Sequence, residues 1–488
     1  MEMSPVEPMI SDRKAPRRRR ITLGQLIDDF IVLASGQFLS KIFGFLAFAW
    51  LARQLTVEDY GAVETAVGMA AIGAIALEMG TGAVGVRRIA QGESSAATVL
   101  GSVIAGRMAL AVLAAPALAL FYITLTKSTA PDLLFWLFAA SLFAVPFNHN
   151  WFFQSREKMG VAGFGQTLKM GAFLVAALVL APQSNGVTYV AVAEIIAATA
   201  MAFWFSGFAF YAIRPERPLY SLASSGKLLR ESAQLGASSF VNALAQYLPI
   251  LVVASVANDI ETAQFGASQR LILSLMTFSY VYYFNLYPLI ARKIVEDAEA
   301  LQRIIAASVR VTAWAGVIMA VLLWTLAPLI MRLIFGRSFE AAAPEFGILA
   351  WSSAIILASG NARWLLVASK RQGALLAAHL VNATCVVGLG YAFASFGGGA
   401  GAAAACIVGA LGLWAVAHWR TAGLVVRPGL AGNLPAVAVA AAIVIALTLI
   451  DLGGLGPVIA ILMLAVGLLC DRQLPIAIEA LVKAKAAT

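Results

Sequence analysis

Residues 36–55 read "GQFLSKIFGFLAFAWLARQL", a stretch that is apolar enough to lie in lipid although Lys41 stands near its middle. Similar apolar runs of about 20 residues recur along the 488-residue chain, and each is long enough to cross a bilayer. Hydrophobic residues make up 61% of the chain and charged residues 12%, about half the charged fraction of a soluble protein. The sequence therefore predicts an all-α, polytopic membrane protein.

Fourteen of these runs are predicted to be transmembrane helices. They lie at about 28–52, 60–82, 98–124, 132–153, 161–181, 187–212, 232–256, 263–290, 304–333, 343–367, 374–395, 400–419, 434–450 and 455–470. A polar segment, "RPERPLYSLASSGKLLRES" at 214–232, follows the sixth run. The predicted domains are a basic cytosolic tail (1–22), a six-helix bundle (23–213), a cytosolic linker (214–231), a second six-helix bundle (232–420), and two further helices with a cytosolic tail (421–488).

The Lys and Arg residues indicate the orientation of these helices, because cytoplasmic loops carry an excess of positive charge. With the N-terminus inside, the cations in outside loops are Arg53, Lys127, Arg332 and Arg337, and the inside segments hold most of the others. The net charge of +9 follows from this topology and does not call for a nucleic-acid partner, which would need a solvated basic face. Both termini are therefore predicted to be cytoplasmic.

Two segments on the predicted outer side resemble each other. "RQLTVEDYGAVETA" at 53–66 aligns without gaps on "NDIETAQFGASQRL" at 258–271, so that Tyr60-Gly61-Ala62 matches Phe265-Gly266-Ala267. Each segment joins the first span of a half to the second. Such repeats are typical of transporters, in which one bundle moves against the other around a central site.

Motifs of soluble enzymes and of metal sites are not found. There is no Walker A sequence and no H-E-x-x-H, and the three histidines lie near span ends, where packing or interfacial roles are expected. The three cysteines have neither metal-ligand spacing nor a disulfide pattern. In "EMGTGAVGVRR" the residues Gly80, Gly82 and Gly85 have the spacing G-x-G-x-x-G. They lie where a predicted membrane helix ends, so they are interpreted as residues that terminate this helix and not as a nucleotide-binding motif. No catalytic residue and no metal ligand is predicted.

Five cations lie deep in the predicted spans: Lys41, Arg107, Lys169, Arg270 and Arg363. A Lys or Arg at the bilayer centre costs about 2.5–3.5 kcal/mol on insertion scales, so such residues usually face a cavity or a partner. The deep acids are Glu64 and Glu194, and three cations stay unmatched even if both acids form ion pairs. This excess of positive charge predicts a site for an anion such as phosphate, which Arg and Lys bind well. Internal ion pairs and snorkelling are the alternative.

The aromatic run "FSYVYYFNLYP" at 278–288 has two interpretations. Tyr rings commonly form a belt at the level of the lipid headgroups. Rings that face a cavity would instead stack on sugar.

Three stretches carry a resemblance to a known family. They are "SGQFLSKIFGFLAFAWLARQLTVEDYGAVETA" at 35–66, "LEMGTGAVGVRRIAQ" at 77–91 and "WFFQSREKMGVAGFGQTLK" at 151–169. In this order and spacing they resemble the polysaccharide (O-antigen) flippases of the Wzx type, in the multidrug/oligosaccharidyl-lipid/polysaccharide (MOP) exporter superfamily. The resemblance covers residues 25–300, and after that it rests mainly on hydropathy.

The resemblance implies two six-helix bundles that form a V, with two extra C-terminal helices. It implies a flippase that moves undecaprenyl-pyrophosphate-linked oligosaccharide across the bacterial inner membrane for exopolysaccharide, capsule or O-antigen synthesis, and hence for lipopolysaccharide. Alternating access would be coupled to a proton or sodium gradient, with no bound cofactor. The residues expected to line the cavity and hold the pyrophosphate are Lys41, Arg107, Lys169, Arg270 and Arg363, while Glu64 or Glu194 would carry coupling ions or pair with these charges.

Other transport functions stay open. A MATE-like multidrug or cation exporter is expected to carry excess buried acid, whereas this chain carries excess buried base. A flippase for the lipid-linked peptidoglycan precursor is closer in chemistry. A membrane glycosyltransferase or polymerase would need catalytic acids and a sizeable outside loop, so the chain is not expected to be an enzyme. Its expected partners are the lipid-linked oligosaccharide, membrane lipids, a polysaccharide polymerase and a chain-length regulator, with no nucleic acid.

Overall fold

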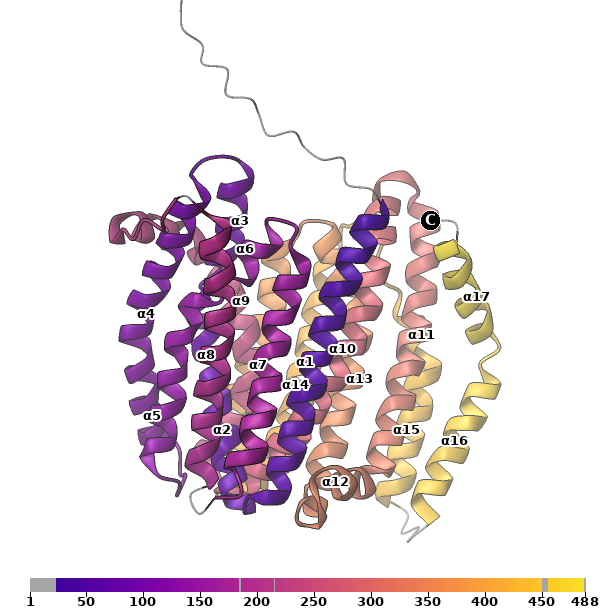
Figure 1. Ribbon diagram of the computed structural model, residues 1–488. Helices are drawn as coiled ribbons and strands as arrows, with labels where there is room; N and C mark the ends of the chain where they lie inside the picture. The colour runs from indigo at the N-terminus through magenta and orange to yellow at the C-terminus, as the bar shows by residue number, and fades with distance from the viewer. Residues whose placement is uncertain (1–22, 184–185, 215, 450–454, 487–488) are drawn as a thin grey trace, which may run out of the picture.

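A computed structural model describes residues 23–183, 186–214, 216–449 and 455–486 (Figure 1). These residues form α-helices and short 3-10 turns, with no strand among them, as predicted. The predicted tail at 1–22 lies outside the described residues. In Figure 1 the beginning of α1 and the end of α17 lie at the end of the bundle that holds α3 and α6, here called the α3 end. The opposite end holds α12 and is called the α12 end.

The N-terminal half supplies the first six predicted spans. Its main helices are α1 (Leu23–Gln54), α2 (Val57–Glu78), α4 (Ala96–Leu125), α5 (Asp132–Ser141), α7 (Met159–Leu180) and α8 (Gly186–Ala212). The short α3 (Thr81–Ala90) continues α2 after a break, and η1 (Leu142–Phe147) and α6 (Asn150–Gln154) continue α5. The break after α2 occurs because Met79 and Gly80 have left-handed backbones, with φ of 46° and 69°.

The C-terminal half packs beside it, and three further helices lie at its outer edge (Figure 1). The half comprises α9 (Leu222–Val256), α10 (Asp259–Glu296), α11 (Ala298–Thr325), α12 (Ala327–Phe335), η2 (Arg337–Ala342), α13 (Ala343–Ala368) and α14 (Gln372–Arg420). The edge comprises η3 (Leu430–Asn433), α15 (Leu434–Leu449), α16 (Gly456–Cys470) and α17 (Gln473–Ala486). Helix α14 is 49 residues long and is kinked at Gly397 and Gly398, where the sequence predicted a gap between two spans.

The predicted count of fourteen spans is not confirmed. By length and hydropathy, 10 of the described helices are long and apolar enough to cross a membrane, or up to 11 if α16 and α17, bent by 69° at their junction, form one span. The kinked α14 counts once in this number, and α9 and α10 do not qualify as whole spans. Helix α10 carries charged and polar residues along its length, which lowers its hydropathy, and the apolar stretch of α9 that counts among the residues searched, Leu244–Val256, is shorter than a span. The multi-pass architecture itself agrees with the prediction.

The two repeat segments begin equivalent helices and pack against each other. The Thr56 hydroxyl accepts a hydrogen bond from the Asp59 amide (3.1 Å) at the start of α2, and the Asn258 carboxamide accepts one from the Glu261 amide (2.9 Å) at the start of α10. Such N-caps satisfy backbone donors that have no partner within the helix. The aromatic residues of the repeat, Tyr60 and Phe265, are fully buried in one hydrophobic core that joins the two halves.

The halves touch at both ends of the bundle. At the α3 end, the Ser225 hydroxyl of α9 donates to the Ser102 carbonyl of α4 (2.8 Å), and Arg88 of α3 donates to the Glu231 carboxylate of α9 (3.0 Å). At the α12 end, Lys127 donates to the Val256 carbonyl (2.9 Å). There the Arg53 side chain of α1 also donates to carbonyls of α12. The two halves are therefore held together by hydrogen bonds at each end of the bundle.

Helix α9 begins ten residues earlier than its predicted span. The segment 222–231, predicted as linker, forms the first turns of α9 and starts where the Ser221 hydroxyl caps the Ser224 amide (3.3 Å). Ser225 and Leu228 are buried there. Packing of this type supplies most of the stability of helices in proteins, so a polar segment becomes helical when another helix covers one face.

Adding a methyl group at Gly61 is expected to lower the stability of the protein. A Cβ atom at this position of α2 would lie 2.0 Å from the Asp259 carbonyl oxygen at the start of α10, so the two halves would have to separate. Overpacking of this kind typically costs about 1–3 kcal/mol. Thermal unfolding in detergent of Gly61→Ala measures the effect. Gly207→Ala is the matched control, because a Cβ atom there meets nothing within 4 Å, and an equal loss in both variants would contradict the close packing.

Candidate functional site

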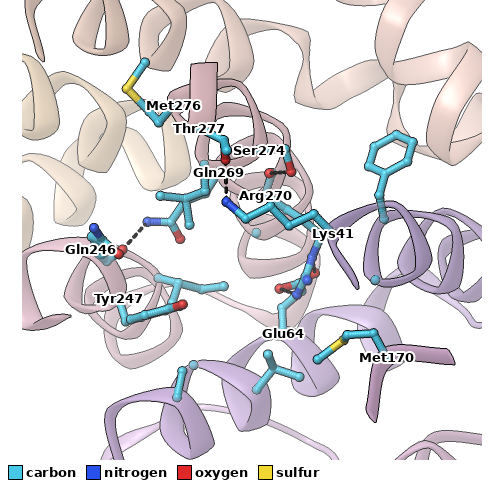
Figure 2. A pocket seen from close by; sticks show the side chains of 18 of the residues that line it. Lys41, Glu64, Met170, Gln246, Tyr247, Gln269, Arg270, Ser274, Met276 and Thr277 are labelled. Carbon is cyan, nitrogen blue, oxygen red and sulfur yellow. Dashed lines mark hydrogen bonds and ion pairs between the residues drawn. The ribbon is translucent and has the colours of Figure 1, made fainter. Parts of the chain in front are cut away.

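A cavity of about 490 Å³ lies between the two halves (Figure 2). Its walls come from α1, α2 and α7 of the N-terminal half and from α9 and α10 of the C-terminal half. The cavity reaches the surface between α1 and α10, where the lining residues Lys41 and Tyr280 are exposed. It therefore has a mouth on the side of the bundle, between one helix of each half.

Lys41 of α1 lies at this mouth. Its ammonium donates a hydrogen bond to the Thr277 hydroxyl of α10, and this bond spans the opening (Figure 2). No described carboxylate forms an ion pair with Lys41. The lysine thus keeps its charge available to a bound anion, with one neutral partner to displace.

Arg270 of α10 projects across the interface and is fully engaged there. Its Nε and Nη2 atoms donate to the two oxygens of Glu64 on α2, at 2.8 and 2.7 Å. The guanidinium also lies 3.3 Å from the centre of the Phe48 ring of α1, a cation–π contact. A bidentate Arg–carboxylate ion pair combines opposite charges with a fixed geometry, so this pair holds α2 against α10 at the cavity.

A second cavity of about 280 Å³ adjoins the first. The two share several lining residues, including Met170, Tyr247 and Arg270. Lys169 of α7 lies in its wall and forms an ion pair with Glu194 of α8 at 2.6 Å. This ion pair contributes no net charge to the central space.

The charge balance of the central space is set by Lys41. Of the three cations that line the two adjoining cavities, Arg270 and Lys169 are each neutralised by one glutamate. Within the described part of the chain, Lys41 is the lining cation that has no acidic partner. The space therefore carries an excess of one positive charge, which favours an anion.

The structure does not bring all five predicted cations to one cavity. Arg107 of α4 lines a separate cavity inside the N-terminal half, where its Nε donates to the Thr81 hydroxyl (2.8 Å). Arg363 of α13 folds back on its own helix and donates to the Ser359 hydroxyl (3.1 Å) and the Ile356 carbonyl (2.9 Å). The grouping expected from the sequence is corrected to Lys41, Lys169 and Arg270. Hydropathy gives the depth of a residue but not the helix face that carries it.

Several neutral polar groups of the cavity were not predicted from the sequence. Gln246 of α9 and Gln269, Ser274 and Thr277 of α10 line it, and Gln269 donates to the Gln246 carbonyl at 2.8 Å (Figure 2). Neutral side chains do not stand out in an apolar run as a Lys or Arg does. The one available signal was the position of Gln269 beside Arg270 in the repeat.

The aromatic run of α10 is divided between two surroundings. Tyr280 is exposed and lines the cavity, as the sugar-stacking interpretation requires. Tyr283 is buried in the C-terminal half, where its hydroxyl donates to the Leu357 carbonyl (2.8 Å) and its ring stacks on Trp364. The run is therefore neither wholly a headgroup belt nor wholly a cavity wall.

Among the described residues, no group of three or more His, Cys, Asp or Glu side chains is placed to hold a metal ion. The cysteines Cys385, Cys406 and Cys470 are free thiols.

Comparison with known proteins places these features in a family context. The chain matches the family model described as "Polysaccharide biosynthesis protein" over residues 26–294, more than half of its length. No curated protein matches the chain in sequence.

Solved structures share its fold at low sequence identity. One, described as "Lipid II flippase MurJ, inward closed conformation", has a TM-score of 0.71 at 12% identity and covers 90% of this chain and 97% of that chain. A second, described as an inward-facing "multidrug resistance MATE family transporter of the MOP superfamily", has a TM-score of 0.63 at 16% identity, with coverages of 84% and 98%. A third, of "MATE in complex with MaL6", has a TM-score of 0.55 at 14% identity, with coverages of 85% and 96%. The predicted MOP-type fold is thereby confirmed.

Proposed function

The chain belongs to the polysaccharide biosynthesis protein family, as its sequence predicted, and from that membership we propose that it is a flippase for undecaprenyl-pyrophosphate-linked oligosaccharide. The observation that carries the proposal is Lys41, a cation without an acidic partner at the mouth of the cavity between the halves. A lysine ammonium is a compact charge suited to a phosphate group. The diphosphate head would displace the Thr277 hydroxyl and bind Lys41.

The mouth between α1 and α10 suits a ligand with a polar head and a long lipid tail. The head would lie in the cavity at Lys41 and Tyr280, while the polyprenyl chain leaves through the mouth into the bilayer. A charged head held in the cavity avoids contact with hydrocarbon, where charges are costly. The inner membrane of a bacterium, with both termini in the cytoplasm, is the proposed location.

Alternating access requires the two halves to separate first at one end of the bundle and then at the other. Contacts of α9 with α3 and α4 would break to admit the head from one side, and contacts of α12 and of the loop at Lys127 would break to release it on the other. A proton or sodium gradient is the proposed driving force. Protonation of Glu64 would free Arg270 to assist Lys41, which links the coupling proton to the phosphate site.

Two other cargoes are less well supported, the first because of the charge of the cavity and the second because of the family match. A cationic drug, the cargo class of an exporter, would meet an excess positive charge. A lipid-linked peptidoglycan precursor has the same diphosphate head, and a solved structure of similar fold is described as a lipid II flippase. At 12% identity that likeness concerns the fold alone. No step of the proposed transport needs covalent chemistry, and a polysaccharide polymerase and a chain-length regulator would act on the product.

Purified protein in liposomes is expected to move undecaprenyl-pyrophosphate-linked oligosaccharide between leaflets. A fluorescent tag on the glycan, quenched from outside, measures the rate with and without an imposed proton or sodium gradient. Lipid II and a cationic dye serve as the competing cargoes in parallel liposomes. Faster movement of the dye or of lipid II than of the oligosaccharide would overturn the proposed cargo.

A further inference from the structure

A separate cavity of about 370 Å³ lies inside the N-terminal half near the α3 end. Its walls come from the end of α2, the start of α3, Arg107 of α4, the α6 region and Gln166 of α7. A volume of this size falls within the usual range of small-molecule sites, about 300–1,000 Å³. The proposed flippase mechanism uses none of the side chains in this cavity.

The lining is rich in carboxamides. Asn148, Asn150, Gln154 and Gln166 all contribute, together with the charged side chains Glu78 and Arg107. A carboxamide offers two N–H donors and a carbonyl acceptor, which match hydroxyl groups that donate and accept in turn. With one acid and one base among its walls, the cavity is not selective for an anion such as phosphate.

Contacts within the cluster fix these groups in place. Gln154 donates to the Asn150 carboxamide oxygen (3.2 Å), and Asn148 donates to the Glu78 carboxylate (3.3 Å). The Gln166 carboxamide forms no hydrogen bond with another described residue. Each of these bonds uses one donor and one acceptor, and the remaining capacity is open to a ligand.

Trp151 supplies an apolar wall. It is buried, and Gly82 and Gly85 of α3 lie so close that a Cβ atom on either would come within 3.0 Å of the Trp151 side chain. The G-x-G-x-x-G spacing thus serves to seat α3 against this residue. The part of Trp151 that borders the cavity lies beside hydrogen-bonding amides, a combination that suits the apolar face and the hydroxyl edge of one sugar ring.

The three cavities follow one another along α2. Along α2 the linings pass from Gly68 in the first cavity to Ala74 in the second and Glu78 in the third. Ten residues separate Gly68 from Glu78, a distance of about 15 Å along a helix. An oligosaccharide whose diphosphate lies in the first cavity would have to extend over this distance to place a sugar several units away in the third.

We propose that the carboxamide cavity is a sugar-binding subsite that holds one hydroxyl-bearing ring of the glycan, some units distal to the diphosphate. The inference rests on the proposed flippase function. It adds that the protein recognises a sugar ring of the cargo as well as the diphosphate. Two neutral hydrogen bonds to the ring would strengthen binding by about tenfold or more. The affinity for the cargo should then depend on glycan length.

The test measures binding of undecaprenyl pyrophosphate carrying zero to four glucose units to the full-length protein in nanodiscs. The wild-type affinity is expected to rise by about tenfold between the one-unit and the longer probes, in a step and not evenly. The double variant Gln154→Leu/Gln166→Leu is expected to lose this step and to bind the sugarless lipid as the wild type does. Gln372→Leu, on the exposed start of α14, is the matched control and should keep the step.

The possible results distinguish failure of the proposed subsite from failure of the proposed function. An affinity that does not change with glycan length in the wild type, or a step that persists in the double variant, would overturn the subsite. Failure of the sugarless lipid to bind, or unchanged binding of that lipid by Lys41→Gln, would instead overturn the proposed function. If the double variant does not fold, the single variant Gln166→Leu is used instead, and it should weaken the step. Its folding should be unaffected, because the Gln166 side chain makes no hydrogen bond within the described structure.

Discussion

Replacing Lys41 by glutamate is expected to lower the rate of oligosaccharide flipping by about 100-fold or more. The new carboxylate would stand where the diphosphate head binds, and like charges in close contact cost several kcal/mol. A difference of about 2.7 kcal/mol already corresponds to a 100-fold change in rate. The liposome assay gives the rate directly, and export of polymer in a strain that lacks the native chain gives it in cells.

The fold is expected to tolerate this change, because Lys41 is exposed and its one hydrogen bond is to Thr277. Thermal unfolding of Lys41→Glu should therefore stay close to that of the wild type. Lys41→Arg keeps the positive charge and should keep most of the flipping rate. Thr277→Val removes the hydroxyl that accepts the hydrogen bond from Lys41 and leaves the charge of Lys41 in place.

A charge reversal elsewhere serves as the control for net charge. Lys483 is exposed on α17 and pairs with Glu479 on the surface, far along the chain from the cavity. Lys483→Glu should leave flipping unchanged. Normal transport by a correctly inserted Lys41→Glu protein would show that Lys41 is not part of the phosphate site.

The helical architecture could be predicted from the sequence because lipid forces a simple pattern. Each span must satisfy its own backbone, so apolar length and loop charge define the elements. The gap predicted between 395 and 400 is the kink of α14, since Gly398 has a φ of 52° that a residue with a side chain rarely adopts. The start of α9 was missed because "SSGK" at 224–227 reads as a loop, and only its packing on α4 makes it helical.

The candidate site was predictable in kind but not in arrangement. A buried charge is conspicuous in an apolar run, and both deep acids were identified with the cations around them. Which acid pairs with which cation depends on how α2 meets α10 and how α7 meets α8. Arg107 and Arg363 lie at similar depth in the sequence pattern, yet they turn away from the central space. The three-dimensional packing of helices decides this, and hydropathy does not record it.

Removing one partner of the Glu64–Arg270 pair is expected to destabilise the protein strongly. Glu64→Leu would leave the Arg270 guanidinium without its acid at the contact between the halves, and Arg270→Leu would leave the buried Glu64 carboxylate unpaired. Breaking a buried ion pair in this way costs about 3–5 kcal/mol. Thermal unfolding in detergent should show a large loss for each single variant.

The exposed pair between Lys293 and Glu296 on the same helix α10 is the matched control. An exposed pair is worth at most about 1 kcal/mol, so Lys293→Leu should change the stability little. A similar loss in Lys293→Leu and Arg270→Leu would contradict a special role for the buried pair.

The double variant Glu64→Leu/Arg270→Leu separates the structural from the functional role of the pair. Apolar side chains that replace both partners are often tolerated in a buried position, so most of the lost stability should return. Transport should not return, because the proposed release of Arg270 by protonation of Glu64 needs both residues. A double variant that is stable but still inactive would mean that the pair acts in the transport cycle. One that regains both stability and gradient-driven flipping would mean that the pair only holds α2 against α10, and that the coupling ion binds elsewhere.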